Sequence, residues 1–413
     1  MKKLLFGAIG VLIIFVSGCG QPGNSTGTNV ADDVEFGKDD YQNITLSGNA
    51  LGMAVLPEIK PDNSGNAFIS PTSLYMALAM AYNGADGKTK EEIADVLHTE
   101  LDAEGMNRAN ASLLAMLDKE SEAITLNVAN SMWLNGEFQL QEGFANSNQD
   151  YFNAELEVID VTAAGTADKI NGWVDDATAG KIKDMVADPL NPDLVVMLLN
   201  AIYFNADWQF EFDEKQTAAA PFYSENGETE EKQFMQMETV LDYMETDEFQ
   251  AVALPYGEGE MTMNVFLPAE GTTLAEFTES LTSEKWESWK TGFSEQPVSI
   301  QMPKFQLSYE VELNDVLKKL GMATAFQKGA NFSKIIEEDD PLWISLVKQK
   351  NFVEVDEKGT EAAAATQIDI VTESAGPEAV SMVVDRPFYI AISDEQTGAI
   401  LFMGAIRDPL AAK

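Results

Sequence analysis

The chain of 413 residues contains one cysteine and one histidine. With Cys19 alone, no intrachain disulfide can form. With His98 alone, multi-histidine zinc sites and the HExxH motif are excluded, and Ser-His-Asp or Cys-His catalysis would depend on that one imidazole. His98 follows an expected helix over residues 89–97, next to acidic Glu100. We therefore interpret His98 as structural, expect no catalytic residue and no metal site, and regard a hydrolase as the remotest class.

Basic residues are also scarce, with 26 Lys and Arg against 68 Asp and Glu and a formal net charge of −42. Such a surface repels phosphate backbones, so we expect no nucleic-acid partner. It also argues against docking through a basic patch on acidic lipids or polyanionic sugars. The charge is spread along the chain and is typical of solvated surface. The sequence predicts no cofactor.

Residues 1–19 have the composition of a targeting segment. Two lysines follow Met1, and the apolar stretch 4–16 is short for a bilayer span. The segment ends Val-Ser-Gly-Cys19, which resembles the lipobox of bacterial lipoproteins, whose cysteine is diacylated. The resemblance implies a signal peptide over 1–19, lipidation of Cys19 and a flexible tether over 20–40. The product would be extracytoplasmic, anchored by lipid to the bacterial cell membrane or envelope, or released from it; an ordinary secretory signal and a buried cysteine are the alternatives.

From about residue 41 the chain is expected to be globular, since 45% of the sequence is hydrophobic and can form a large core, although its length alone would allow two or three domains. The apolar run 195–204 (VVMLLNAIYF) predicts a central strand covered on both faces. Thr89 and Glu92 have the spacing of a capping box. Residues 273–290 are expected to be one helix, and residues 298–307 one strand. Helices come first, and strands and helices then mix without a βαβ rhythm, so the predicted fold class is α+β.

The stretch 357–374 reads EKGTEAAAATQIDIVTES and alternates with period two. One face of a strand here would carry Thr360, Ala362, Ala364, Thr366, Ile368, Ile370 and Thr372. The other would carry Glu361, Ala363, Ala365, Gln367, Asp369, Val371 and Glu373. The pattern favours a strand, although taken alone it also fits an Ala-rich helix or a linker.

Several motifs, in this order and spacing, resemble the serpins, the serine protease inhibitor superfamily, over roughly residues 49–409. They are Phe68-Ile69-Ser70-Pro71 with Ser73, residues 171–174 and 178–182, Asn200-Ala201-Ile202-Tyr203-Phe204 with Trp208, residues 357–366, residues 382–392 and Leu401-Phe402-Met403-Gly404. The resemblance implies a single domain over residues 41–413, with about nine helices around three β-sheets and an exposed reactive-centre loop. It implies an inhibitor of serine endopeptidases rather than an enzyme, acting as a monomer on an extracellular serine protease.

In inhibitory serpins the cleaved loop inserts into the main sheet and traps the acyl-enzyme. The resemblance assigns the hinge of this loop to Glu357, Gly359, Thr360, Glu361, Ala362, Ala363, Ala364 and Ala365. Small inward side chains favour rapid insertion, because large or charged ones would overpack the sheet or bury charge. The hinge therefore indicates an inhibitor; the alternative is a non-inhibitory serpin-fold binding or storage protein.

The scissile bond of the family lies about sixteen residues beyond the hinge glutamate, which gives Glu373–Ser374. A glutamate at this position suits a Glu-specific protease, whereas cleavage after Thr372 or Val371 would indicate an elastase- or subtilisin-like target. The resemblance also implies a latch called the shutter and a sheet end called the breach, formed by Ser70, Ser73, Asn200, Trp208 and Gln349. Gln349 stands where the family usually has histidine; its amide can both donate and accept hydrogen bonds.

Overall fold

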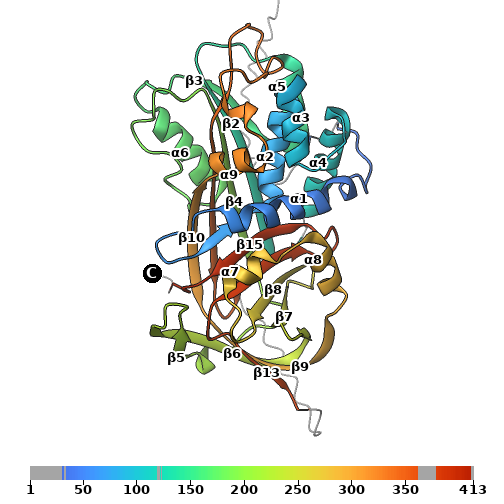
Figure 1. Ribbon diagram of the computed structural model, residues 1–413, viewed down its shortest axis with the longest axis vertical. Helices are drawn as coiled ribbons and strands as arrows, with labels where there is room; N and C mark the ends of the chain where they lie inside the picture. Colours follow the sequence, from blue (N-terminus) through green and yellow to red (C-terminus); the bar gives the residue numbers. More distant parts are fainter. Residues whose placement is uncertain (1–29, 32–33, 119–120, 122, 361–377, 411–413) are drawn as a thin grey trace, which may run out of the picture.

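The computed structural model describes residues 30–31, 34–118, 121, 123–360 and 378–410 (Figure 1). Within these ranges the α-helices are α1 Gln42–Val55, α2 Pro71–Gly84, α3 Gly87–Val96, α4 Ala103–Leu117, α5 Glu142–Phe152, α6 Thr166–Ala177, α7 Leu274–Glu279, α8 Ser283–Lys290 and α9 Asn314–Leu320. Short 3-10 turns lie at η1 Leu56–Glu58, η2 Glu214–Gln216 and η3 Thr324–Phe326. None of the helices in the described ranges is long and apolar enough to cross a bilayer.

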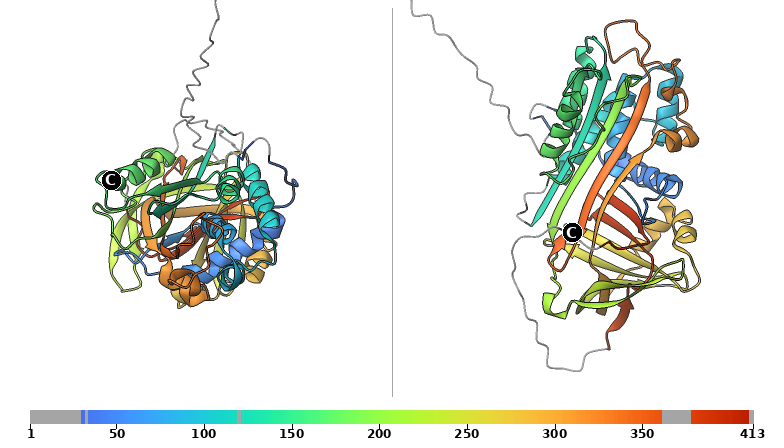
Figure 2. Two further views of the ribbon diagram at one scale, coloured as in Figure 1. Left: turned by 90° about the horizontal axis from the view of Figure 1, so that it is seen from above. Right: turned by 90° about the vertical axis from the view of Figure 1, so that its left-hand side faces the viewer.

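The main sheet has six strands in the order β10-β11-β12-β4-β2-β3, with β11 also pairing directly with β4. Its strands are β10 Phe305–Glu312, β11 Ile344–Val355, β12 Gly359–Thr360, β4 Val196–Asp207, β2 Ile124–Asn135 and β3 Glu155–Ile159. Nearly all of β4 is buried, as expected for a strand covered on both faces. The long strands run side by side, with α6 on one face and other helices on the opposite face (Figure 2).

The second sheet has nine strands in the order β1-β15-β14-β8-β7-β6-β9-β13, and β5 pairs with β6. Its strands are β1 Ala67–Ile69, β5 Ala218–Tyr223, β6 Thr229–Glu245, β7 Phe249–Tyr256, β8 Met261–Pro268, β9 Ser294–Pro303, β13 Val380–Val383, β14 Phe388–Asp394 and β15 Ile400–Ile406. The expected α+β serpin fold is confirmed. Where three sheets were expected, the described residues form two hydrogen-bonded networks, because the long strand β6 joins two parts of the nine-stranded sheet.

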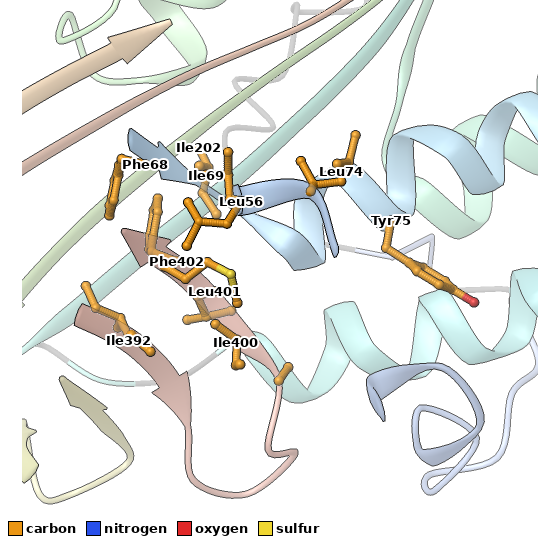
Figure 3. Packing of buried hydrophobic residues seen from close by; sticks show 14 of the residues in the cluster. Leu56, Phe68, Ile69, Leu74, Tyr75, Ile202, Ile392, Ile400, Leu401 and Phe402 are labelled. Carbon is orange, nitrogen blue, oxygen red and sulfur yellow. The ribbon is translucent and has the colours of Figure 1, made fainter. Parts of the chain in front are cut away.

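The core is continuous between the two sheets and the helix α2. Ser70 caps α2 by accepting a hydrogen bond from the Ser73 N–H, and Pro71 occupies the first helical position, where no N–H is needed. Almost every residue of α2 is buried. The rings of Phe68 and Phe402 stack at 5.3 Å, and Ile202 of the main sheet lies close to them (Figure 3). This core packs against the face of the main sheet that carries Ile202.

Three local predictions were wrong. Thr89 does not cap a helix: α3 begins at Gly87, and the Thr89 hydroxyl accepts from the Asn331 N–H instead. Residues 273–290 form two helices, since Thr282 caps the second one, α8. Residues 298–307 belong to two strands, β9 and β10, which separate where β9 ends at Pro303.

Candidate functional site at the opening of the main sheet

The candidate site is the seam between β4 and β11, the two central strands of the main sheet. These strands pair in parallel from Val196 and Ile344 to Tyr203 and Phe352. Beyond this point their ends diverge and the two-residue strand β12 lies between them. The sheet is thus closed over most of the seam and open at one end.

Strand β12 is antiparallel to both neighbours. Thr360 is paired with Val355 of β11 and with Ala206 of β4, and Gly359 is paired with Asp207. A Cβ atom on Gly359 would lie 2.1 Å from the Ala206 carbonyl oxygen, so only glycine fits here without a shift of the backbone. The first residues of the expected hinge are therefore already part of the sheet.

The Thr360 side chain is buried and contacts an aromatic residue of the second sheet. Thr360 is fully buried, and its hydroxyl lies 2.7 Å from the hydroxyl of Tyr256. Burial raises the pKa of Tyr256, so this phenol stays neutral. The Trp208 ring stacks on Tyr256 at 4.2 Å, and its indole N–H donates to the Asp356 carbonyl at 2.9 Å. These contacts hold Thr360 of the hinge in place.

Glu357 fixes the turn that leads into β12. It is 6% exposed, its carboxylate lies 2.6 Å from Lys304 Nζ, and it accepts a hydrogen bond from the Thr217 hydroxyl at 2.6 Å. Burial would raise the pKa of this carboxyl, but the hydrogen bonds from Lys304 and Thr217 and the Lys304 charge outweigh it and hold the pKa below the ordinary value. Glu357 is therefore charged at neutral pH and bound on two sides.

The closed part of the seam is held by a row of buried amides. Asn130, Asn200 and Gln349 lie opposite one another on β2, β4 and β11. Asn200 donates to Asn130 Oδ1 at 2.7 Å and accepts from Gln349 Nε2 at 2.7 Å. The last of these bonds crosses the seam.

Gln349 and Asn200 also connect the seam to the core beneath it. Gln349 Oε1 accepts from the Ser70 N–H at 2.8 Å, and Nε2 donates to the Ser70 carbonyl at 3.0 Å. Gln349 Oε1 also accepts from Asn351 at 3.0 Å, and Asn200 donates to the Ser73 hydroxyl. Gln349 thus makes four hydrogen bonds, two with Ser70 and one each with Asn200 and Asn351, which use its whole amide. In this way it connects the seam to the core from the position where the family usually has histidine.

The structure brings together Ser70, Ser73, Asn200 and Gln349 at the seam, and Trp208, Glu357, Gly359 and Thr360 at its open end. Other residues singled out from the sequence lie outside the described ranges: Cys19, Glu361, Ala362, Ala363, Ala364, Ala365, Val371, Thr372, Glu373 and Ser374. His98 is exposed after α3. The described ranges contain no group of three or more His, Cys, Asp or Glu placed to hold a metal ion.

Sequence reasoning missed five contributors to this site. Asn130, Thr217, Tyr256 and Lys304 reach it from distant parts of the chain, whereas Asn351 lies two residues from Gln349 on β11. Asn130 and Asn351 are polar residues at buried strand positions, which is the local signal that could have identified them.

Comparison with known proteins agrees with this geometry. The family model described as serpin (serine protease inhibitor) matches residues 47–409. Iripin-2 of Ixodes ricinus is 32% identical over 371 residues, covering 88% of this chain and 93% of that protein. Serpin B9 of Homo sapiens is 34% identical over 377 residues, covering 88% and 100%. The native-state crystal structure of the thermophilic serpin tengpin superposes with a TM-score of 0.82 at 28% identity, covering 92% and 97%.

The chain therefore belongs to the serpin family. Serpins are generally protease inhibitors, although some are not. One solved structure, that of human thyroxine-binding globulin complexed with its ligand, has a TM-score of 0.81 at 23% identity over 90% of this chain and 100% of that one, and shows the shared fold alone.

Proposed function

We propose that this protein is a suicide-substrate inhibitor of extracellular serine proteases, which it traps by inserting its cleaved loop into the main sheet. The observation that supports this most directly is the position of β12 between β4 and β11. The hinge has begun to enter the sheet at the end where a loop strand would have to enter first.

Extended beyond Thr360, the register of β12 would meet that of the seam without a shift. Thr360 lies between Ala206 and Val355, and Asn200 and Gln349, each six residues earlier, face one another across the seam. An antiparallel strand continuing from Thr360 would therefore place Thr366 between Asn200 and Gln349. Cleavage after Glu373 would leave enough chain to reach the level of Leu342, beyond the start of β11.

The side chains of this strand suit such a path. Ala362 and Ala364, which would enter first on the inward face, are small and avoid overpacking. Ile368 and Ile370 follow, and burial of each would contribute roughly 1.5–3 kcal/mol. The new strand also gains a ladder of backbone hydrogen bonds on both sides. Insertion is therefore easy to start and strongly favourable once complete.

The proposed reactive bond is Glu373–Ser374, with Thr372 and Val371 as the alternative acylated residues. A protease with a basic specificity pocket, such as a glutamyl endopeptidase, fits Glu373. An elastase- or subtilisin-like enzyme would fit the alternatives. The proposed location is the outer side of a bacterial cell membrane or envelope, with Cys19 carrying the lipid and residues 20–40 as the tether, or release from that membrane.

A cleavage-and-melting experiment distinguishes an inhibitor from a binding or storage protein of the same fold. A protease that cuts the loop but is not trapped is used to nick the chain, and thermal unfolding is followed before and after. An inserted strand predicts a large rise in the unfolding temperature. An unchanged unfolding temperature would support the non-inhibitory alternative.

A further inference from the structure

Residues 407–410, called the tail here, follow β15 and are bound to two segments that are distant in the sequence. Asn66, just before β1, accepts hydrogen bonds from the N–H groups of Arg407 at 2.8 Å and Asp408 at 3.0 Å, and donates to the Asp408 carbonyl at 2.8 Å. The N–H of Gln306 on β10 donates to the Leu410 carbonyl at 2.9 Å. The tail is therefore fixed to the start of β1 and to the edge strand of the main sheet.

The Asp408 side chain ties the tail to a third segment, strand β6. Its carboxylate lies 2.5 Å from Nζ of Lys232, whose side chain is only 12% exposed. The second partner of Lys232, Glu230, lies at 2.8 Å but is 53% exposed, so solvent and salt screen that pair more strongly. Burial would lower the pKa of Lys232, but the hydrogen bonds to Asp408 and Glu230 outweigh it and raise the pKa. Lys232 is therefore charged, and Asp408 is its more buried partner.

The contacts of the tail lie on both sides of Lys304, the residue that pairs with the hinge. Lys304 is the single residue between β9 and β10, and its N–H donates at 2.8 Å to the carbonyl of Gln233, which directly follows the lysine bound by Asp408. Two residues further on, Gln306 is bound by the tail itself. Lys304 Nζ lies 2.6 Å from the buried carboxylate of Glu357. The tail thus holds the backbone before and after the position from which Lys304 reaches the hinge.

We propose that Asp408 is a positioning residue for the hinge, acting through Lys232 and then through the Lys304–Glu357 pair. This deepens the proposed function and rests on it. A buried ion pair is stabilising only while its geometry is good. Without the Asp408 charge, Lys232 keeps only its exposed partner, and the segment of β6 that holds Lys304 is less fixed. Glu357 then loses part of its stabilisation, and the turn into β12 opens more often.

Arg407 provides a control from the same tail. Its guanidinium lies 3.3 Å from the Glu225 carboxylate and donates to the Gly65 carbonyl at 3.0 Å. Within the described ranges, neither partner has a hydrogen bond or ion pair with Lys304. Arg407→Gln therefore removes a neighbouring ion pair of the tail without touching the path to the hinge.

The test asks whether Asp408 and Glu357 are coupled. Glu357→Gln is introduced into the parent, Asp408→Asn and Arg407→Gln, and the urea midpoint is measured at pH 6 in about 0.2 M salt, where distant charges are screened. We expect the midpoint shift caused by Glu357→Gln to fall to about half or less in Asp408→Asn and to stay within about a fifth of the parent value in Arg407→Gln. Asp408→Glu, which keeps the charge, should restore much of the shift. A shift of parental size in Asp408→Asn, or equal reductions in both variants, would overturn the proposal.

Hydrogen exchange of the hinge gives a second readout. Amides of residues 357–360 should exchange faster in Asp408→Asn than in Arg407→Gln, and faster still in a chain that ends at Arg407, which also lacks the bond to Gln306. Equal exchange in the two point variants would contradict the positioning role, whether or not the shortened chain folds. Neither readout needs a protease. If the parent traps no protease while these differences appear, the proposed function fails and the positioning role stands.

Discussion

The hydroxyl groups of Thr360 and Tyr256, two fully buried residues, lie 2.7 Å apart at the open end of the main sheet. This contact joins Thr360 of the hinge to a residue of the second sheet. The start of the hinge is therefore held in the main sheet before any cleavage. The Thr360 side chain already occupies a buried position, where a larger or charged side chain would not fit.

Thr360→Arg should convert the inhibitor into a substrate. An arginine cannot be buried beside Tyr256 without leaving an unpaired charge, so the hinge would stay outside the sheet and insertion would be slow. We expect the number of inhibitor molecules consumed per trapped protease to rise at least about tenfold, with the cleavage site unchanged. Thr360→Ser, which keeps the hydroxyl, is the control; normal trapping by the arginine variant would disprove the insertion path.

The carboxylate of Glu357 should make hinge stability depend on acidic pH. The pKa of Glu357 is lowered in the folded state, so its charge stabilises the fold. This contribution to the free energy of unfolding is fully present above the ordinary glutamate pKa of 4.5, and it is lost as pH falls through the lower folded-state pKa. In urea unfolding, the parent should be more stable than Glu357→Gln at pH 6, and the two should converge in acid. A stability difference that stays constant down to pH 3 would show that the Lys304 pair does not act in this way.

Gln349→Leu should weaken the closed seam. The leucine leaves Asn200 Oδ1 and the Ser70 N–H without a partner in a buried site, while the Ser70 carbonyl keeps only its bond from the Leu74 N–H. We expect a loss of about 2–4 kcal/mol in the free energy of unfolding. Gln349→His introduces the residue usual in the family, but an imidazole can make only some of the four hydrogen bonds. Its free energy of unfolding should lie between those of the parent and Gln349→Leu. Stability equal to the parent in Gln349→Leu would show that the amide row does not hold the seam.

Thr366 should matter only after insertion. The register of β12 places it between Asn200 and Gln349 in an inserted strand, where its hydroxyl can replace the hydrogen bond that those two amides lose. Thr366→Val should leave the uncleaved protein unchanged and reduce the stability gained on cleavage by about 1–3 kcal/mol. Thr366→Ser should behave like the parent. An equal gain in the valine variant would place another residue at the amide row.

Local sequence signals correctly predicted those elements whose conformation depends mainly on residues close in the sequence. The apolar run of β4 is of this kind. The apparent capping box at Thr89 and Glu92 failed because both side chains bind a distant segment instead, Thr89 at Asn331 and Glu92 at Thr324. A short-range pattern cannot reveal a better partner more than 200 residues away.

The same limit applies to the candidate site. Gly359 and Thr360 were identified from the hinge pattern, but nothing near Tyr256, Lys304 or Thr217 indicated a role at the hinge. These residues meet the hinge only because the second sheet packs against the end of β4, where Trp208 and Tyr256 form an isolated bridge. Such contacts depend on the relative placement of two sheets, which period-two patterning leaves undetermined.

The trapping mechanism is tested most directly by the mass of the product formed with a glutamyl endopeptidase. The expected result is an SDS-resistant species whose mass equals that of the protease plus the chain ending at Glu373 less one water, as required for an ester between them, together with a released peptide that begins at Ser374. If this protease and a panel of elastase- and subtilisin-like enzymes all cleave the loop and turn over freely, with no covalent species, the protein is not an inhibitor of this kind.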